Sequence, residues 1–208
     1  MNVSILGTGN MGAGFAALLA EKHDVCIGHP DRARATELAS RIGQRVRGES
    51  IAAAVASSGI IILAVPFAAV AQVLSDAGDL TGKIIVDITN PVSADFSELS
   101  IGYSTSAAEE IQKLAPLAKV VKAFNTLFAQ LLPEASRQQS KLQTFIASDD
   151  SESKARVTEL AESVYLQPVD AGPLKNSRYL EPLGALNIQF GYFLGQGPVV
   201  APAWIQAR

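Results

Sequence analysis

The segment Val3-Ser4-Ile5-Leu6-Gly7-Thr8-Gly9-Asn10-Met11-Gly12 joins a short apolar run to the start of a helical pattern. In this context Gly7 permits a tight turn, Gly9 lets the backbone approach a ligand, and Gly12 lets the helix pack on the strand. Free N–H groups at the start of a helix favour an anion. A plain connecting turn is the alternative, but strand, loop and helix together predict a Rossmann-type site for the pyrophosphate of a dinucleotide.

The alternation of strand and helix patterns continues along the chain and predicts an α/β fold. We expect a doubly wound, mainly parallel sheet with helices on both faces. No repeat or linker is visible, so one domain is expected over residues 1–208, with a helical, apolar C-terminal extension from about residue 175. Strands are expected at residues 3–6, 24–28, 44–47, 59–65, 83–88, 119–124, 144–148 and 166–170. Helices are expected at residues 10–22, 32–42, 50–56, 66–74, 105–114, 126–132, 151–164 (with Ser151 as N-cap) and 176–194.

Composition excludes several classes of protein. Of 208 residues 48% are apolar and 18% charged, which argues against disorder, and the net charge of −3 argues against a nucleic-acid binder. Because Cys26 is the single cysteine and there are two histidines, no disulfide framework or metal site is expected. Two uncharged stretches, residues 51–75 and 182–207, are interrupted by glycine, proline and polar residues, so no membrane insertion is expected. With no signal-peptide pattern at the N-terminus, we expect a cytoplasmic protein.

The end of the second strand bears on the choice between NAD and NADP. An Asp or Glu at this point usually binds the ribose hydroxyls of NAD, whereas this chain has Gly28-His29-Pro30. Arg32 and Arg34 follow, and a guanidinium there can bind a 2′-phosphate. The alternative is a solvated first helical turn, which the neighbouring Asp31 favours. The charges favour NADP, with NAD as the second candidate.

Two further strand ends are expected to face the cofactor. Ala64-Val65-Pro66-Phe67 and Thr89-Asn90-Pro91-Val92 each end a predicted strand with a proline that turns the chain. Ligands of such sheets lie outside the carboxyl ends of the parallel strands. The alternative is that each of these prolines only marks an ordinary loop. The position of both segments at strand ends favours cofactor binding.

These and later segments resemble the reductases that couple NADP to the deazaflavin coenzyme F420. They are also similar to the cytosolic oxidoreductase domain of the STEAP metalloreductases, which passes hydride from NADPH to a flavin. The similarity runs from Met1 to about Leu194. The segments that carry it are Gly7-Thr8-Gly9-Asn10-Met11-Gly12, Ala64-Val65-Pro66, Asn90-Pro91-Val92-Ser93, Lys122-Ala123-Phe124-Asn125-Thr126 and Asp170-Ala171-Gly172-Pro173-Leu174-Lys175-Asn176-Ser177-Arg178-Tyr179-Leu180-Glu181.

The resemblance implies a role for particular residues. Thr8 to Met11 match the pyrophosphate loop, and His29 and Arg34 match positions near the 2′-phosphate. Pro30 replaces an arginine that the family has at this point, and Arg32 is the candidate substitute. Along the nicotinamide half, the matching positions are Val65, Asn90 and Ala123.

The sequence offers few groups for acid–base catalysis, and we expect no catalytic residue in the strict sense. Both histidines lie near the second strand, and Tyr179 is isolated. Hydride transfer to a flavin or deazaflavin needs no protein acid, so the protein supplies stacking and orientation. Phe67, Asn125 and Thr126, with Leu127 and the helix over residues 183–194, are candidates for binding this small-molecule acceptor. Asn125 is expected either to donate a hydrogen bond to a ring carbonyl or to cap the helix that follows it.

Alternatives remain for both function and assembly. Imine reductases and β-hydroxyacid dehydrogenases share the Gly-x-Gly-Asn-Met-Gly opening but add a helical domain of ~100 residues. Here about 30 residues follow Lys175, and Tyr179 stands where those dehydrogenases have Asn, so that class is disfavoured. A reductase of a small imine, carbonyl or quinone and a non-catalytic NADP sensor stay open.

The apolar residues 190–204 either form a homodimer interface or cover the acceptor, and the two are compatible.

Overall fold

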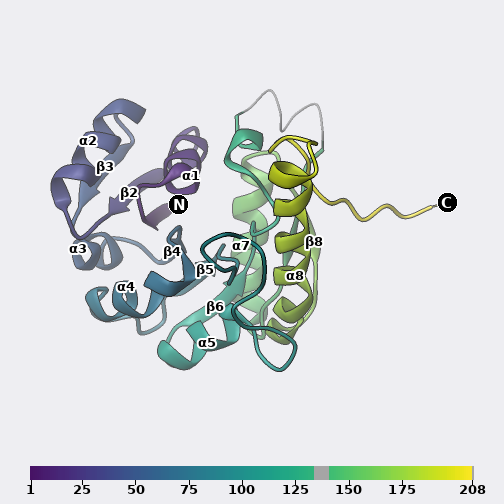
Figure 1. Ribbon diagram of the computed structural model, residues 1–208. Coiled ribbons are helices and arrows are strands. Elements are labelled where there is room, and N and C mark those ends of the chain that lie inside the picture. Colours follow the sequence, from purple (N-terminus) through teal and green to yellow (C-terminus); the bar gives the residue numbers. More distant parts are fainter. Residues whose placement is uncertain (134–140, 208) are drawn as a thin grey trace.

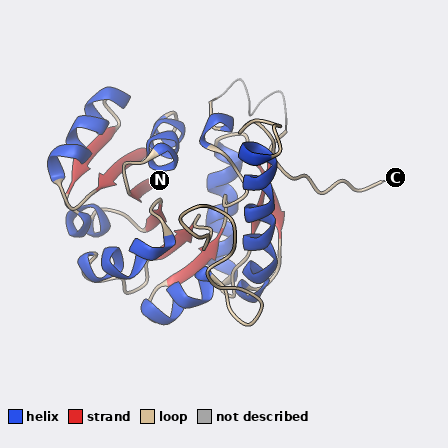
Figure 2. Cartoon of the chain, viewed as in Figure 1, coloured by secondary structure: helices blue, strands red, loops and turns tan. Residues whose placement is uncertain are grey.

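The protein, here a computed structural model, is described over residues 1–133 and 141–207. Its main strands are β1 (Asn2–Leu6), β2 (Asp24–Gly28), β3 (Val46–Glu49), β4 (Ile60–Leu63), β5 (Ile84–Asp87) and β6 (Lys119–Lys122). Together they form one parallel sheet in the order β3-β2-β1-β4-β5-β6 (Figures 1 and 2). This is the order of doubly wound dinucleotide-binding sheets, so the predicted fold class is confirmed.

Helices cover both faces of this sheet (Figure 2). Side chains of β4 show why, because Ile60 and Ile62 belong to one buried cluster and Ile61 and Leu63 to the other. A strand covered on both faces needs such a continuous apolar sequence. The first cluster includes residues of α1 (Asn10–Ala20), α2 (Arg32–Ile42) and α7 (Ser151–Ser163). The second includes residues of α3 (Ile51–Ala56), α4 (Val70–Asp76) and α5 (Ala107–Leu114).

The last two strands depart from the predicted single sheet. β7 (Gln143–Ile146) and β8 (Gln167–Asp170) pair in parallel with each other in a separate two-stranded sheet. An isolated antiparallel bridge between Lys122 and Ala147 links this pair to β6. The bridge runs opposite to the parallel pairing that the alternating pattern predicts.

Three local predictions need correction. Asp150, and not Ser151, caps α7, because its carboxylate accepts a hydrogen bond from the backbone N–H of Ser153 at 2.8 Å. The helix expected over residues 126–132 is a single 3-10 turn, η2 (Ala129–Leu131). The helix expected over residues 66–74 begins as the 3-10 turn η1 (Phe67–Ala69) and becomes α-helical at Val70.

The C-terminal region packs next to the carboxyl ends of β5 and β6, where Glu181 contacts Lys122. It begins with η3 (Leu174–Asn176), continues in α8 (Ser177–Ile188) and ends in one π-helical turn, η4 (Gln189–Phe193), which confirms the predicted helix. The remaining residues to 207 have no helix or strand. Val200 stays beside α8, since its carbonyl accepts a hydrogen bond from Asn187 at 3.3 Å, and the last residues form the yellow tail of Figure 1. Within residues 1–133 and 141–207, no helix combines the length and the apolar character that a bilayer crossing requires.

Candidate functional site

The glycine loop between β1 and α1 is packed against the end of β4. Gly7 has a φ of 122°, and a Cβ there would lie 2.3 Å from the carbonyl oxygen of Ala64. A Cβ on Gly12 would lie 2.2 Å from the carbonyl oxygen of Gly7. Both positions therefore require glycine for the turn and for the close packing of helix and strand. A Cβ on Gly9, in contrast, would meet no atom within 4 Å.

The start of α1 faces a cavity of about 320 Å³ at the point where the strand order reverses. Gly9 is the N-cap of α1, no side chain caps this helix, and its first turn carries no acidic residue. Unsatisfied N–H groups at a helix start favour an anion, so this cradle fits a pyrophosphate. The cavity brings together the predicted residues of three strand ends, and it is lined by Leu6, Gly7, Thr8, Gly9, Gly28, His29, Pro30, Ile51, Ala64, Val65, Pro66, Ala69 and Val73.

The tip of β2 carries paired rather than isolated charges. The guanidinium of Arg32 is 3.1 and 3.2 Å from the two carboxylate oxygens of Glu49, at the end of the neighbouring β3. Arg34 lies 3.8 Å from Asp31, whose carboxylate also caps α2. Arg32 and Arg34 therefore stand beside His29 with carboxylates as partners. Both arginine side chains are exposed, at 66% and 69%, so water screens these pairs and a phosphate can compete with them.

A second cavity, of about 240 Å³, opens on the other side of the first turn of α1. Among the predicted residues it brings together Asn10, Met11, Asn90, Asn125 and Thr126. Phe67 is not among its lining residues and packs instead against the second core cluster. Ala123 is fully buried and lines neither of the two cavities. The lining also includes Ile88, Phe96, Leu127, Phe128, Ala129, Gln130, Gly184, Asn187, Ile188 and Tyr192.

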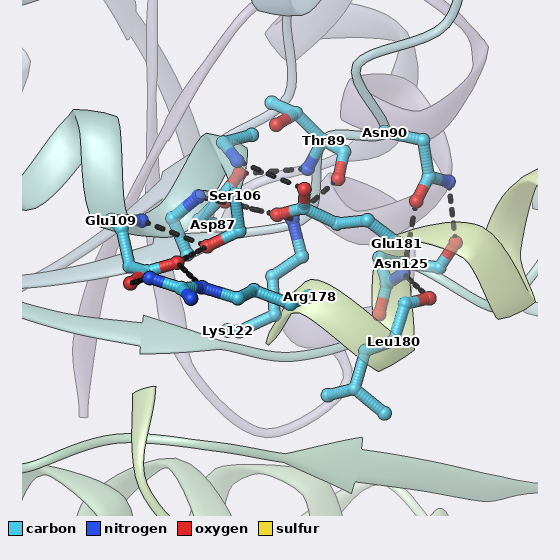
Figure 3. Close-up of polar contacts among 12 residues, drawn as sticks. Asp87, Thr89, Asn90, Ser106, Glu109, Lys122, Asn125, Arg178, Leu180 and Glu181 are labelled. Atoms are coloured by element: carbon cyan, nitrogen blue, oxygen red, sulfur yellow. Dashed lines mark hydrogen bonds and ion pairs between the residues drawn. The ribbon is translucent and has the colours of Figure 1, made fainter. Parts of the chain in front are cut away.

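Two asparagine side chains form a reciprocal pair at this cavity (Figure 3). Asn90 Nδ2 donates to the backbone oxygen of Asn125 at 2.8 Å, and Asn125 Nδ2 donates to Asn90 Oδ1 at 2.9 Å. Asn125 Nδ2 also donates to the carbonyl of Leu180 in α8 at 2.8 Å. Both amide hydrogens of Asn125 are thus engaged, and η2 has Phe128 at its N-cap. The helix-cap role expected for Asn125 is therefore wrong. In this arrangement Asn125 has no free amide hydrogen for a ring carbonyl, so the donor role stays a prediction.

What remains on the asparagine pair is an acceptor. Asn125 Oδ1 and Thr126 Oγ1 are buried and have no hydrogen-bond partner within the part of the chain that the structure describes. A buried polar atom without a partner costs about 1–3 kcal/mol. Both atoms belong to residues that line the second cavity, although each oxygen itself is closed off from solvent. The aromatic and amide side chains of the lining fit a flat, polar ring.

The backbone at Phe124 explains how Asn125 reaches this position. Phe124 is buried with a φ of 59°, a left-handed conformation that non-glycine residues adopt infrequently. Its N–H donates to Thr144 Oγ1 at 3.0 Å, and its ring packs 5.1 Å from that of Phe15. These contacts turn the chain sharply after β6 and bring Asn125 beneath α8.

A buried triad of charged residues, Asp87, Lys122 and Glu181, lies next to the asparagine pair (Figure 3). Lys122 Nζ is 2.8 Å from Asp87 Oδ2 and 2.8 Å from Glu181 Oε1, and it donates to the carbonyl of Thr89 at 2.6 Å. The carboxylate of Glu181 also accepts the N–H groups that begin α5, from Ala107 at 2.9 Å and Ala108 at 3.2 Å. The buried triad thus joins β5, β6, α5 and α8.

Electrostatics in the buried triad are tightly coupled. Desolvation acts to lower the pKa of Lys122, but Asp87 and Glu181 outweigh it and hold the pKa above its usual value. Burial, the largest influence, raises the pKa of Glu181, although Lys122 opposes this. All three side chains are between 0% and 2% exposed. Lys122 is therefore a cation held between two anions, not a free acid or base.

Sequence reasoning missed Glu181 as a residue of the site, and it included Gly184 only as part of the candidate helix over residues 183–194. Gly184 matters because a Cβ there would lie 2.4 Å from Asn90 Oδ1, so the Asn90 side chain packs directly on the backbone of α8. The segment of residues 170–176, part of a motif that carries the family resemblance, shapes the entry into α8. Asp170 accepts from the backbone of Gly172, and Asn176 donates to the carbonyl of Ala171. The motif over residues 170–181 indicated that this region is important, but it did not indicate the buried contacts of Glu181 or the close packing of Gly184.

No group of three or more His, Cys, Asp or Glu side chains in residues 1–133 and 141–207 is arranged to hold a metal ion.

Comparison with known proteins gives consistent matches. The family model described as NADP oxidoreductase coenzyme F420-dependent matches residues 2–91. The F420-dependent NADP reductase of Methanothermobacter marburgensis is 29% identical over 90% of this chain and 91% of its own length. Metalloreductase STEAP3 of Rattus norvegicus is 31% identical over 87% of this chain, but the chain spans 36% of the length of that protein.

A solved structure extends the similarity to the whole fold. A candidate F420-dependent NADP reductase from Arthrobacter sp. FB24 superposes with a TM-score of 0.84 at 30% identity, covering 94% of this chain and 95% of that one. The strand order, the glycine cradle and these matches agree. The chain therefore belongs to the family of coenzyme F420-dependent NADP oxidoreductases.

Proposed function

We propose that the protein transfers hydride between NADPH and a flavin or deazaflavin-type acceptor, and that the two cavities hold the two partners of this reaction. One observation carries the proposal: Thr8 and Gly9 line the first cavity, and the next two residues, Asn10 and Met11, line the second. A dinucleotide whose pyrophosphate sits on the start of α1 reaches both cavities, with its adenosine half near His29 and its nicotinamide half near Asn90.

The chain's own contribution is binding, orientation and exclusion of water. NADPH, when bound, supplies the hydride. Among the described residues, the lining of the second cavity contains no Asp, Glu, Lys, Arg or His, and the charged groups next to the asparagine pair are paired with one another in the buried triad. A flavin or deazaflavin takes up hydride without a protein acid, and catalysis then depends on holding two rings in contact.

The second cavity suits a flat acceptor. Phe96, Phe128 and Tyr192 supply aromatic surface, with the Phe128 and Tyr192 rings 5.3 Å apart in an edge-to-face arrangement. A ring N–H, such as that between the two carbonyls of a deazaflavin, would complement Asn125 Oδ1 once a small shift of the cavity lining exposes this buried atom. The relatives named as F420-dependent reductases support coenzyme F420 as the first candidate, with flavin as the second.

Turnover tests this proposal. The protein is mixed with NADPH and, separately, coenzyme F420, free flavins, quinones and simple imines, and NADPH oxidation is followed optically. With NADPH deuterated at C4, we expect the label to appear on the ring carbon of the reduced deazaflavin. Turnover with imines or quinones alone would favour a reductase of small substrates, and binding without any turnover would favour an NADP sensor.

We expect the change Arg34→Ala to raise the dissociation constant for NADPH about tenfold or more, and that for NADH less than threefold. The reason is that a guanidinium–phosphate contact adds about 1.5–3 kcal/mol, and only NADPH has the 2′-phosphate. Calorimetric titration of both nucleotides measures the two effects.

The variant Glu49→Gln tests the same assignment in the opposite direction. It removes the carboxylate that lies 3.1 Å from Arg32, so Arg32 is free to bind the 2′-phosphate. We expect tighter NADPH binding and unchanged NADH binding. Equal effects of either variant on the two nucleotides would contradict the NADP assignment.

We also propose that residues 1–208 act as one domain and that two copies associate through the C-terminal region. The supporting feature is a set of exposed apolar side chains on α8, η4 and the tail, among them Leu186, Phe193 and Trp204. Such surface is typical of interfaces between subunits. Analytical ultracentrifugation of the wild type and Trp204→Glu tests this: a monomer in both would exclude the interface.

A further inference from the structure

We propose that the buried triad Asp87–Lys122–Glu181 is a positioning device that sets the asparagine pair Asn90–Asn125 at the wall of the second cavity. This inference deepens the proposed function and rests on it for the identity of the ligand. The alternative is that the triad only attaches α8 to the sheet. The contacts of Thr89 with the triad and of Leu180 with Asn125 favour the positioning role, since Thr89 precedes Asn90 and Leu180 precedes Glu181.

The first link runs from Lys122 to Asn90. Lys122 Nζ holds the carbonyl of Thr89 at 2.6 Å, and Asp87 Oδ1 accepts the N–H of Thr89 at 2.8 Å. Both polar backbone groups of Thr89 are thereby held by the triad. Asn90 is the next residue, so the triad fixes the point from which its side chain leaves the strand end.

The second link runs from Glu181 to Asn125. Glu181 binds Lys122 on the sheet and the N–H groups of Ala107 and Ala108 on α5, which fixes α8 at this residue. The preceding residue, Leu180, presents the carbonyl that accepts from Asn125 Nδ2 at 2.8 Å. Because a carbonyl only accepts, this contact forces the amide nitrogen toward α8 and leaves Oδ1 as the unpartnered acceptor.

The third link is the close packing of α8 on Asn90. Gly184 lies less than one helical turn after Glu181, and a Cβ on it would come within 2.4–2.8 Å of all three polar-end atoms of the Asn90 side chain. The rotation of α8 about its axis therefore decides how much room Asn90 has. Glu181, buried on the same helix, fixes that rotation.

A second ion pair joins the same two helices and serves as the control. Arg178 forms two hydrogen bonds with Glu109, at 2.7 and 2.8 Å, and so connects α8 to α5 (Figure 3). Neither residue contacts Asn90 or Asn125 in these bonds. The variants Glu181→Gln and Glu109→Gln thus weaken the attachment of α8 in two ways, one through the buried triad and one apart from it.

The direct readout is exchange of the Asn125 side-chain amide hydrogens with solvent, followed by NMR in the full chain. We expect slow exchange in the wild type and in Glu109→Gln, and exchange about tenfold or more faster in Glu181→Gln. Unchanged exchange in Glu181→Gln, or the same acceleration in both variants, would overturn the inference. This readout needs neither NADPH nor an acceptor.

The second readout is the separation of binding from turnover. In Glu181→Gln we expect kcat with NADPH and coenzyme F420 to fall about 10–100-fold, because small misplacement of a reacting group has effects of this size. The dissociation constant for NADPH, set mainly at the glycine loop, is expected to change less than threefold. Glu109→Gln, at a comparable loss of thermal stability, is expected to keep its kcat.

These readouts separate the two proposals. Altered amide exchange in Glu181→Gln with no wild-type turnover on any acceptor would contradict the proposed function and leave the positioning role standing. Normal exchange and kcat in Glu181→Gln would contradict the positioning role alone. Should Glu181→Gln fail to fold, Asp87→Asn gives the same test from the sheet side, with the same expected results.

Discussion

Replacing Lys122 by methionine is expected to lower the free energy of unfolding by about 3–5 kcal/mol, the usual cost of removing one partner from a buried ion pair. The variant retains the apolar stem but leaves Asp87 and Glu181 facing each other without a cation. Both carboxylates are buried, so water cannot replace the lost ammonium. Urea denaturation of the wild type and the variant at neutral pH measures the loss.

The pH dependence of this loss has a definite sign. Lys122 opposes the raised pKa of Glu181, so removing Lys122 raises that pKa further, and a carboxyl group with a raised pKa favours folding only when it is protonated. The variant should therefore regain stability relative to the wild type as the pH falls. The wild type keeps the stabilising contribution of Lys122 throughout this range. Because the pKa of this lysine is raised, that contribution is lost only at strongly alkaline pH.

A double variant checks the cause of the Lys122 effect. Adding Glu181→Gln to Lys122→Met removes one of the two uncompensated charges, so the double variant should be more stable than the sum of the two single losses predicts. Strict additivity of the two changes, or a loss that is constant between pH 5 and 8, would show that packing rather than charge determines the effect.

The change Gly9→Asp is expected to raise the dissociation constant for NADPH about 100-fold or more, which abolishes binding at ordinary concentrations. The stability of the folded protein is expected to stay unchanged. Asp is a preferred N-cap residue, Gly9 already has the extended N-cap conformation, and its side-chain space is free within 4 Å. The new carboxylate would occupy the start of α1, where the pyrophosphate is proposed to bind. Calorimetry and thermal unfolding measure the two properties in parallel.

Gly9→Asn is the matched control, since it adds nearly the same volume and caps a helix as well but carries no charge. It should weaken NADPH binding less than Gly9→Asp does. Unchanged affinity in Gly9→Asp would mean that the nucleotide does not use this helix start.

Local sequence was enough to predict the glycine loop, β2 and α2, although it placed β3 at residues 44–47 instead of Val46–Glu49. The glycines of residues 7–12 are required by contacts inside one strand–turn–helix unit, and the predicted bounds of β2 and α2 match the observed ones. The pattern of apolar residues in β4 reports burial on both faces directly. Such features depend on neighbours a few residues apart, which a single sequence displays.

The second cavity could be predicted only in part. Asn90, Asn125 and Thr126 were candidates and do lie together, but their hydrogen bonds depend on the carbonyl of Leu180, 55 residues beyond Asn125. The buried triad joins residues from β5, β6 and α8, and nothing near Glu181 in the sequence indicates a buried charge. Phe67 shows the opposite error, since its position after β4 suggested the cavity and its side chain packs elsewhere.

The separate β7–β8 sheet shows a further limit. The sequence predicts strands and a parallel pairing, and both are observed. Which sheet a strand joins depends on how the chain turns after β6, where Phe124 takes a left-handed conformation. Hydrophobic periodicity contains no information on that turn.

Isothermal titration of the folded wild-type protein with NADPH and with NADH tests the central claim, that the start of α1 holds a dinucleotide between the two cavities. We predict saturable binding of one NADPH per chain, weaker binding of NADH, and loss of both in Gly9→Asp. Absence of heat and of affinity for either nucleotide, in protein whose circular dichroism shows a folded α/β structure, would contradict the account.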